Sequence, residues 1–476
     1  MFTFGSVFQK LSAAGTGFHT PVFLLAFFTF LVLFTWTPAR RRRVLVLLVS
    51  IAFYLLAGPG AVLILLVSSL LNFMFVRLIH RIESPFGRKV TLAVTVATTL
   101  SFLAWWKYLS FALGTVGLTP ESALGRLWVW PLNLAPPLGI SFFCFLQISY
   151  GVDVYGRKLS PLSVCRYAHF ILFFPKMVSG PLVRPAEFAD KYSSIGAIDN
   201  SLVRQGLQRL AVGLIKKIVF ADALAVLVNS AFGSDFQGMS CWRSLFSLYA
   251  YAFQIYLDFS GYTDMAIGIS MMLGYRLPEN FDRPYAAESV RDFWRRWHIT
   301  LGAWLRDYVY IPLGGSRVAK PLVIFNLMAT FLLCGLWHGA SWNFVIWGGL
   351  HGIYLVAGRL ISTARFFKNR TALVWVNRFL TFNAVVFAWL FFRAADLQTV
   401  GHFFGTFRAV SLEGSELMWL LYAVALVVAH GIMSRLKRCF LGVEVHPTIS
   451  MACIAAVGFM AAGTVFELTP FIYANF

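Results

Sequence analysis

The amino-acid sequence predicts an all-α polytopic membrane protein. Of its 476 residues, 59% are hydrophobic and only 13% are charged, whereas soluble domains carry roughly 25% charged residues. The mean hydropathy is +0.72, and the 48 Phe and 15 Trp residues fit lipid-facing helices and interfacial belts. Apolar runs of about bilayer length recur along the whole chain, so we expect a membrane protein with many crossings.

The apolar runs predict about 10 to 13 crossings, because one span needs about 20 residues and several runs are shorter or longer than that. The runs lie at residues 20–36, 44–57, 61–79, 91–114, 137–156, 205–230, 243–274, 320–337, 341–361, 372–395, 415–435 and 450–470. The first run precedes four arginines and lacks a small-residue cleavage site. It is therefore predicted to be a span rather than a cleaved signal peptide.

The basic residues predict the orientation of these crossings. Residues 40–43 follow the first run and belong in the cytoplasm by the positive-inside rule, which places the amino terminus outside. Residues 58–60 then form an outer turn, and the basic cluster at 77–89 returns to the cytoplasm. The charge-poor connection 115–136 is external, and the basic residues between 157 and 166 are internal again.

The formal net charge of +20 does not indicate a nucleic-acid partner. The basic residues form short clusters between apolar runs, as at 40–43, 77–89 and 216–217, which membrane topology explains better than a phosphate-binding face. The six cysteines (144, 165, 241, 334, 439 and 453) are scattered without a CxxC pair, so neither a disulfide framework nor a zinc site is indicated. We expect no metal site, and no phosphate-cradling loop is present in the sequence.

Two segments are apolar or aromatic without being predicted to cross the membrane. Residues 166–188 are interrupted by three prolines and a glycine, which favours a re-entrant segment buried in protein. Residues 275–319 are too polar to cross and too aromatic to be free in water. They are predicted to form amphipathic helices at the cytoplasmic face.

Within that second segment, residues 291–308 are predicted to form one helix with two faces. Aromatic and leucine side chains fill one sector of about 120°. A separate sector of about 80° holds Arg291, Arg295, His298, Gly302 and Arg306. Guanidinium groups beside an imidazole suit an anionic ligand, such as the phosphates of a nucleotide carrier. An interfacial helix whose arginines contact lipid head groups, and in which His298 has no functional role, explains the pattern equally well.

His338 ends an apolar run within the motif GLWHGASW (335–342). Ionisable groups are costly in hydrocarbon, so this histidine is a functional candidate, and desolvation favours the neutral ring that a general base requires. A buried histidine bound to a backbone carbonyl is the alternative. Cys334 lies one helical turn earlier and could form a Cys–His nucleophile, although a small core residue is the better interpretation. Trp337 and Asn343 are further candidates for lining this site.

Asp258 and Asp264 lie inside an apolar run, where a carboxylate must pair or line an aqueous path. In a transporter they would relay protons, and in an enzyme they would orient a histidine or a substrate hydroxyl. A structural hydrogen-bonding role is as well supported. His351, in the motif GGLHGIY, is expected to have a packing role.

Several long motifs in order resemble one known family. They are PLGISFFCFLQISYGVDVY (137–155), FFPKMVSGPLVRP (173–185), GLIKKIVFAD (213–222), YLDFSGYTDMAIGISMMLGYRLPENFDRPY (256–285), RDFWRRWHITLGAWLRDYVYIPLGG (291–315) and GLWHGASWNFVIWGGLHG (335–352). The chain resembles the membrane-bound O-acyltransferases from about residue 20 to 361, and within them the bacterial alginate O-acetyltransferase branch. The YIPLGG ending at 310–315 favours that branch over relatives that transfer D-alanine.

The resemblance implies a single domain over residues 1–476, with amino-terminal helices at 1–136, a catalytic core at 137–361 and carboxyl-terminal helices at 362–476. It implies about eleven transmembrane helices around a tunnel. His338 would be the catalytic base, and His298 a second functional residue on the cytoplasmic side. Arg291, Arg295 and Arg306 would bind the donor, with the candidates Asp258, Asp264, Trp337 and Asn343 along the tunnel.

We therefore expect an enzyme of the bacterial inner membrane that moves an acetyl group from a cytoplasmic thioester to an extracytoplasmic polysaccharide, an alginate-like exopolysaccharide in the first place. Acetyl-CoA would be the donor substrate, with no bound cofactor. A periplasmic acetyltransferase of the hydrolase-like type would be the partner. The alternatives are a transporter or flippase for an acyl or sugar-lipid carrier, D-alanyl or peptidoglycan acyl transfer, and a scaffold for a secretion complex.

Overall fold

The computed structural model describes residues 17–118, 137–363, 371–408, 445–462 and 470–472. These residues are mainly helical and contain no strand, which confirms the all-α class. The run at 415–435, most of the connection at 115–136 and the amino-terminal tail lie outside the described residues.

The helices follow the predicted apolar runs closely. The amino-terminal part contains α2 (Pro21–Trp36), α3 (Ala39–Leu55), α4 (Pro59–Arg81), α5 (Pro85–Leu103), the π-helical turn η1 (Ala104–Tyr108) and α6 (Leu109–Thr115). The next part contains α8 (Ile140–Tyr155), α9 (Val164–Leu172), α10 (Phe174–Met177), α11 (Pro185–Lys191), η2 (Tyr192–Ser194), α12 (Asn200–Leu214), the π-helical turn η3 (Ile215–Ala221), α13 (Asp222–Gly233) and α14 (Cys241–Met272).

The remaining elements carry the predicted site. They are η4 (Pro284–Ala286), α15 (Val290–Arg296), α16 (Ile299–Leu305), the π-helical turn η5 (Arg306–Tyr310), α17 (Lys320–His338), α18 (Trp342–Thr363), α19 (Thr371–Arg393), α20 (Leu397–Gly405), η6 (Thr406–Arg408) and α22 (Pro447–Ala462). The short amphipathic helix α20 was not predicted, since its nine residues are too few to register as an apolar run of bilayer length.

Among the described residues, five helices are long and apolar enough to cross a membrane. They are Gly60–Arg81, Pro85–Thr115, Lys320–His338, Trp342–Ile361 and Leu373–Arg393. Three shorter apolar helices are Pro21–Trp36, Ile140–Tyr155 and Pro447–Phe459. The chain is therefore a polytopic membrane protein, while the number of crossings, about 10 to 13, stays a prediction.

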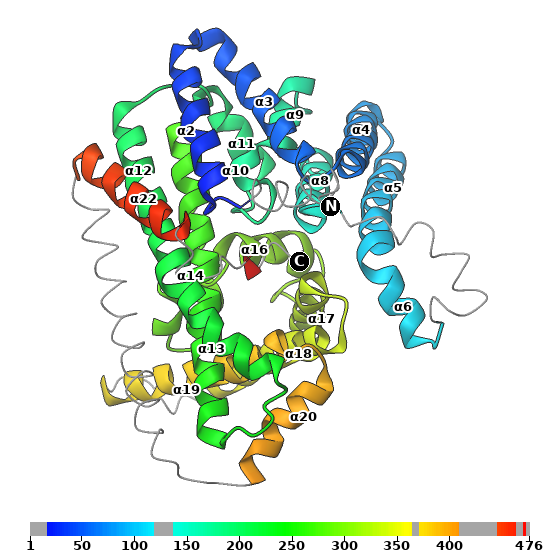
Figure 1. Cartoon of the computed structure of the whole chain (residues 1–476). Coiled ribbons are helices and arrows are strands. Elements are labelled where there is room, and N and C mark those ends of the chain that lie inside the picture. The colour runs from blue at the N-terminus through cyan, green and yellow to red at the C-terminus, as the bar shows by residue number, and fades with distance from the viewer. Residues whose placement is uncertain (1–16, 119–136, 364–370, 409–444, 463–469, 473–476) are drawn as a thin grey trace.

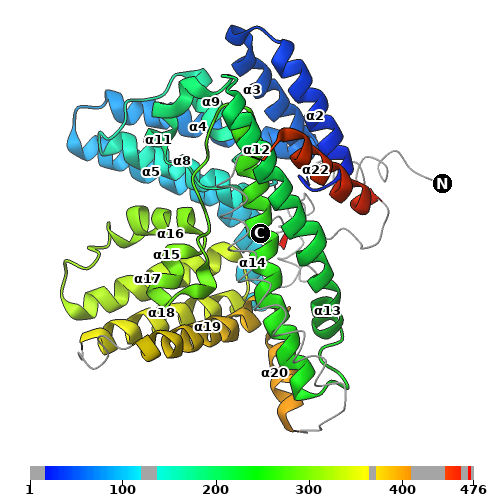
Figure 2. The same cartoon turned by 90° about the vertical axis from the view of Figure 1, so that its left-hand side faces the viewer.

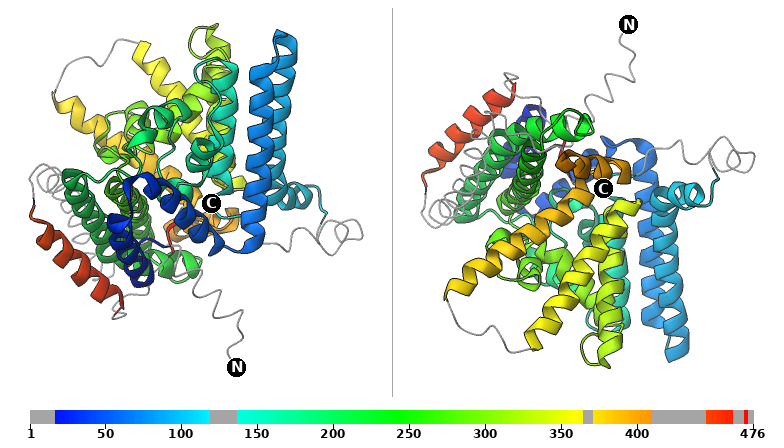
Figure 3. Two further views of the ribbon diagram at one scale, coloured as in Figure 1. Left: turned by 90° about the horizontal axis from the view of Figure 1, so that it is seen from above. Right: turned by 90° about the horizontal axis from the view of Figure 1, so that it is seen from below.

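The helices are arranged as a long column with two groups beside it. The continuous stretch α12–η3–α13 runs along α14 and forms the column, and Figure 2 shows α4, α5 and α8 on one side of it above the group α15 to α19. Within that lower group, α17 packs along α18, and α18 packs against α19. Seen from above and below, α22 and the pair α4–α5 lie at opposite edges of the molecule (Figure 3).

Glycines bring α12 and α14 into close contact. A Cβ atom added at Gly206 would lie 2.7 Å from the carbonyl oxygen of Gly268, and one added at Gly213 would lie 2.6 Å from that of Gly261. Only glycine permits this approach of two helix backbones, as small residues do at membrane helix interfaces generally.

The interruption predicted within residues 166–188 is confirmed. Helix α9 ends at Leu172, the single turn α10 follows, and an extended stretch leads to α11. The residues from 170 to 183 are buried, so this irregular backbone is surrounded by protein, as its apolar setting requires.

The single helix predicted for residues 291–308 is wrong. Helix α15 ends at Arg296, and α16 begins at Ile299. His298 between them adopts a left-handed conformation with φ of +41°, which turns the chain. Histidine is one of the few residues other than glycine that enters this region with some frequency.

Candidate active site

His338 is the last residue of α17 and is 1% exposed. Its ring lies among aromatic rings of three helices: Trp337 on α17 at 4.8 Å between centroids, Trp347 on α18 at 4.9 Å and Phe392 on α19 at 5.1 Å. The imidazole therefore faces the interior of the helix group and does not face the lipid.

His298 is fully buried, and its orientation is set by Asn280. The Asn280 side-chain oxygen accepts hydrogen bonds from the Thr300 backbone N–H at 3.1 Å and the Thr300 hydroxyl at 2.9 Å. The Nδ1 atom of His298 lies 3.2 Å from the same oxygen, and because that oxygen only accepts, Nδ1 donates. The proton of the neutral ring is thus on Nδ1, which leaves Nε2 as the basic nitrogen. Burial lowers the pKa of His298 to about 3, so this ring is neutral at physiological pH.

The structure brings the two predicted histidines to the same tryptophan. The ring centroid of His298 lies 6.1 Å from that of Trp337, and that of His338 lies 4.8 Å from it. The Trp337 ring is itself held by α8, since Phe145 stacks on it at 5.3 Å and Phe142 meets it edge-on at 5.3 Å. His298, Trp337 and His338 therefore form one cluster, which we call the histidine cluster.

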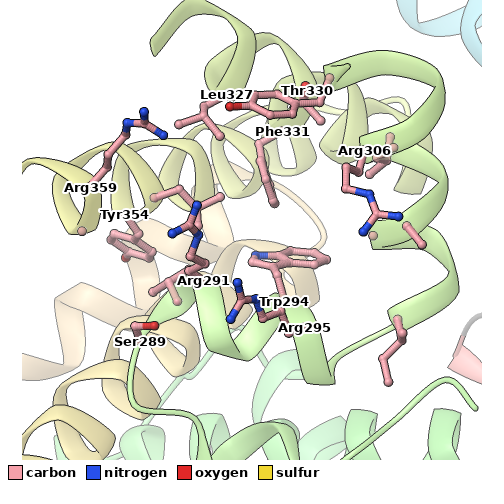
Figure 4. Close-up of a pocket in the computed structure, with 18 residues that line it drawn as sticks. Ser289, Arg291, Trp294, Arg295, Arg306, Leu327, Thr330, Phe331, Tyr354 and Arg359 are labelled. Atoms are coloured by element: carbon pink, nitrogen blue, oxygen red, sulfur yellow. The ribbon is translucent and has the colours of Figure 1, made fainter. Parts of the chain in front are cut away.

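A cavity of about 730 Å³ lies beside α15 and α16. Its lining includes Arg291, Arg295 and Arg306, so the predicted arginine face does enclose a site. Arg359 of α18 adds a fourth guanidinium group, and sequence reasoning missed it because it lies in an ordinary helix end. In Figure 4, Arg359 and Arg306 stand at opposite sides of this arginine pocket, with Arg291 and Arg295 between them.

The rest of the arginine pocket is mainly apolar. It is lined by Ser289, Val290, Trp294, Ile299, Gly302, Ala303, Leu305, Tyr310, Leu327, Thr330, Phe331, Tyr354, Leu355 and Gly358. His298 is not part of this lining, which corrects the expectation that it shares a face with the arginines. The break at Trp297 and His298 turns its side chain toward Asn280 instead.

The arginine pocket and the histidine cluster share two helices, α16 and α17. Thr330 of α17 lines the pocket, and His338 lies eight residues further along the same helix, about 12 Å away at 1.5 Å per residue. Trp294 also lines the pocket and donates from Nε1 to Nδ1 of His351 at 3.2 Å. The His351 ring packs on Trp347 at 4.8 Å, and Trp347 packs on His338. A packed aromatic layer thus connects the two sites.

Asp258 and Asp264 take part in buried ion pairs and do not line the arginine pocket. Lys217 lies 2.8 Å from Asp258 and 2.8 Å from Asp222. Asp264 lies 2.6 Å from both Arg209 and Lys216. These contacts join α12 and η3 to α14.

The same ion pairs correct the interpretation of residues 216–217 as a basic cluster set by membrane topology. Lys216 is 4% exposed and Lys217 is fully buried. Both side chains turn inward because carboxylates of α14 and α13 compensate the cost of burying an ammonium group.

Two further candidates near His338, Asn343 and Cys334, make the following contacts. The Asn343 amide nitrogen donates to the carbonyl oxygen of Ala394 at 2.8 Å and so ties α18 to the end of α19. Cys334 is fully buried, in keeping with a small core residue. Within the described residues, no group of three or more His, Cys, Asp or Glu side chains could hold a metal ion.

Comparisons with known proteins identify relatives that match most of the chain. The family described as "MBOAT, membrane-bound O-acyltransferase family" matches residues 49–395. The peptidoglycan O-acetyltransferase of Helicobacter pylori is 35% identical over 422 residues, covering 80% of this chain and 78% of that protein. The "Probable alginate O-acetylase" of Azotobacter vinelandii is 34% identical over 437 residues, covering 87% of this chain and 85% of that protein. The teichoic acid D-alanyltransferase of Bacillus subtilis is 30% identical over 278 residues, covering 55% and 68%.

Proposed function

The chain belongs to the membrane-bound O-acyltransferase family, and from this premise we propose that it transfers an acetyl group from a cytoplasmic thioester to an extracytoplasmic polysaccharide. The observation that carries the proposal is the pairing of a buried histidine cluster with a pocket that presents four arginines. Relatives named for alginate and for peptidoglycan support the polysaccharide class, with alginate-like polymers first.

In this mechanism His338 acts as the general base. Its neutral ring takes the proton of an acceptor hydroxyl, and the oxygen attacks the carbonyl carbon of the thioester. The new C–O bond forms, the C–S bond breaks, and the thiolate leaves and takes up a proton. The aromatic rings around His338 exclude bulk water, which protects the thioester from hydrolysis. His298, whose Nε2 is the basic nitrogen, positions the donor or takes part in the proton transfer.

The donor enters through the arginine pocket. Guanidinium groups bind phosphate oxygens through pairs of hydrogen bonds, so Arg291, Arg295 and Arg306 suit the phosphates of acetyl-CoA. The apolar remainder of the pocket suits the chain that carries the thioester. Thr330 in the pocket lies about 12 Å along α17 from His338, so the proposal requires the acetyl end to pass between the aromatic rings that separate the two sites.

The orientation follows from the positive-inside rule, with the arginine pocket at the cytoplasmic face of the bacterial inner membrane and the amino terminus outside. The acceptor is a sugar hydroxyl or the serine of a periplasmic acetyltransferase of the hydrolase-like type, which passes the acetyl group to the polymer.

The test uses inverted membrane vesicles from the native host, which retain acceptor and partner proteins, supplied with radiolabelled acetyl-CoA. Wild-type protein should place alkali-labile label in the polysaccharide fraction. His338→Ala should abolish that label at equal amounts of folded protein. Cys334→Ala, one turn away and equally buried, should keep it, since the cysteine is a core residue. Ester formation by His338→Ala at the wild-type rate would contradict the proposal.

The same vesicles separate the enzyme from a transporter or flippase. A transporter would move label into the lumen without forming an ester. The ion pairs of Asp258 and Asp264 with lysines and an arginine disfavour the proton relay that this alternative requires. Transfer of D-alanine is tested by supplying the labelled amino acid as a thioester in place of acetyl-CoA.

A further inference from the structure

A half-buried lysine from a distant part of the chain contacts the end of the helix that carries His338. The Nζ atom of Lys107 donates to the backbone carbonyl oxygen of Trp337, and it lies 3.3 Å from the carbonyl oxygen of His338. It also lies 3.3 Å from the Ser141 hydroxyl at the start of α8. No pattern in the sequence predicts this residue near the site, since it lies 231 positions before His338.

The neighbouring residue makes the same kind of contact. The Tyr108 hydroxyl donates to the backbone carbonyl oxygen of Leu336 at 2.7 Å. Lys107 and Tyr108 both belong to the π-helical turn η1, which interrupts the helix formed by α5 and α6. A π-helical turn inserts one residue into a helix and is found frequently at functional sites. Here it presents two consecutive side chains to three consecutive carbonyl groups.

These contacts provide hydrogen-bond partners both for the terminal carbonyl groups of α17 and for the N–H groups of Lys107, which would be costly to bury without partners. The last carbonyl groups of a helix lack intrahelical partners and carry the negative end of the helix dipole. A lysine ammonium in an apolar interior needs acceptors for its three N–H groups. The oxygens of Trp337, His338 and Ser141 supply three acceptors.

The contacts also fix the residues that form the histidine cluster. Lys107 binds the carbonyls of both Trp337 and His338, and its ammonium lies 5.9 Å from the centre of the Trp337 ring. The direction of a side chain follows from its backbone, so a shift of this terminal turn moves both rings. A misplacement of about 1 Å can cost about 100-fold in rate.

We infer that Lys107 is a positioning residue for the acyl-transfer reaction: it holds the terminal turn of α17 so that His338 meets the acceptor hydroxyl in reactive geometry. The inference rests on the proposed function, because it assigns His338 the role of base. Lys107 itself acts through the backbone of α17 and takes no part in the proton transfer.

The test compares two cations that cap helix ends. Lys107→Met removes the donors and keeps an unbranched side chain of similar length. Arg88→Met is the matched control, because Arg88 on α5, which continues into η1, donates to the carbonyl oxygen of Tyr155 at the end of α8, away from the histidine cluster. Both variants are assayed in inverted vesicles over a range of acetyl-CoA concentrations, with folded protein quantified by size exclusion in detergent.

Lys107→Met should lower the maximal rate per folded molecule by about 10- to 100-fold, with the apparent KM for acetyl-CoA changing less than about twofold. Arg88→Met should change the amount of folded protein without changing either kinetic parameter. A Lys107→Met protein that transfers acetyl groups at the wild-type maximal rate, or that differs only in KM, overturns the inference.

If Lys107→Met is not recovered as folded protein, Tyr108→Phe tests whether contacts from η1 position the end of α17. This variant keeps the ring and removes only the hydrogen bond to Leu336, so the maximal rate should fall by about two- to tenfold with KM unchanged. An unchanged maximal rate in this variant overturns the inference as well. Failure of the wild-type protein to transfer label counts against the proposed function itself, whereas normal wild-type transfer with normal variants counts against the role of Lys107 alone.

Discussion

Arg295 lines the arginine pocket from α15, one helical turn after Arg291. Arg295→Gln removes a positive charge that binds phosphate and should therefore raise the apparent KM for acetyl-CoA by about 5- to 10-fold. The increase is modest because solvent in the pocket weakens charged hydrogen bonds. The maximal rate should stay within about twofold, because the thioester reacts at the histidine cluster and not at the phosphates. Initial rates in inverted vesicles at increasing acetyl-CoA measure both parameters.

Arg317→Gln is the control for Arg295→Gln. Arg317 is exposed and does not line the arginine pocket, so its loss removes the same charge without removing a ligand contact. Equal increases in KM for the two variants would show that net charge, rather than this pocket, attracts the donor. Raising the salt concentration should narrow the difference between wild type and Arg295→Gln, because salt screens exposed charges.

The sequence predicted the candidate residues better than their grouping. The apolar surroundings of His338 indicated a buried ring, and the pocket contains the three predicted arginines. The placement of His298 with those arginines failed because it assumed an uninterrupted helix. No glycine or proline marks the break, and a single left-handed residue whose ring binds Asn280 is decided by tertiary contacts. Lys107 and Arg359 could not be predicted, since tertiary contacts alone bring them to the site.

At the scale of helices, the contact between α12 and α14 depends on glycine. Gly213→Ala should lower the free energy of unfolding by about 1–3 kcal/mol, because the added methyl would lie 2.6 Å from the carbonyl oxygen of Gly261, a backbone atom that cannot move aside alone. The midpoint of thermal unfolding of the detergent-solubilised protein measures this effect.

Gly233→Ala serves as the control for that helix contact. Gly233 ends α13, and an added Cβ atom there meets no neighbour within 4 Å. Its replacement should leave the midpoint unchanged or raise it slightly, since alanine is the better helix former. If Gly213→Ala unfolds at the same midpoint temperature as Gly233→Ala, the close contact between α12 and α14 does not contribute to stability, and the prediction is wrong.

Helix boundaries were predictable where an apolar run ended at a turn signal, as at Gly58 between α3 and α4, where φ is +110°.

The charge pattern did not predict the contacts that residues 40–43 make. They lie within the first turns of α3 instead of in a loop, and Arg42 reaches back to the carbonyl oxygens of Phe34 and Thr37 at the end of α2. The positive charge thus caps a neighbouring helix, which charge counting alone cannot predict.

At the scale of the molecule, the orientation in the membrane predicts which side of the bilayer reaches Cys165. This residue is exposed on α9, whereas Cys144, Cys241 and Cys334 are buried. A membrane-impermeant maleimide should modify Cys165 in inverted vesicles and should leave it unmodified in intact spheroplasts, because residues 157–166 are predicted to be cytoplasmic. Cys165→Ser should remove the modification at this position, which peptide mapping distinguishes from modification of the partly exposed Cys453. Modification from the outer side would reverse the orientation proposed for the whole chain.

The class of the molecule was predictable, while the path of its chain through the bilayer was not. Composition and the length of the apolar runs suffice to predict an all-α membrane protein, because a chain that crosses hydrocarbon must satisfy its backbone polar groups internally, as a helix does. They do not say which apolar runs cross, since 205–230 and 243–274 contain charged residues that become acceptable only when paired across α12, η3 and α14.

That pairing leads us to expect an order of events during membrane insertion. Lys216 and Lys217 emerge from the ribosome about forty residues before Asp258 and Asp264. A charged side chain alone at the bilayer centre costs about 2.5–3.5 kcal/mol on translocon scales. Asp222 in the same segment can pair with Lys217, whereas Lys216 pairs with Asp264 of the later segment. We therefore expect the segment 205–230 to be retained in the bilayer only after the segment 243–274 has joined it.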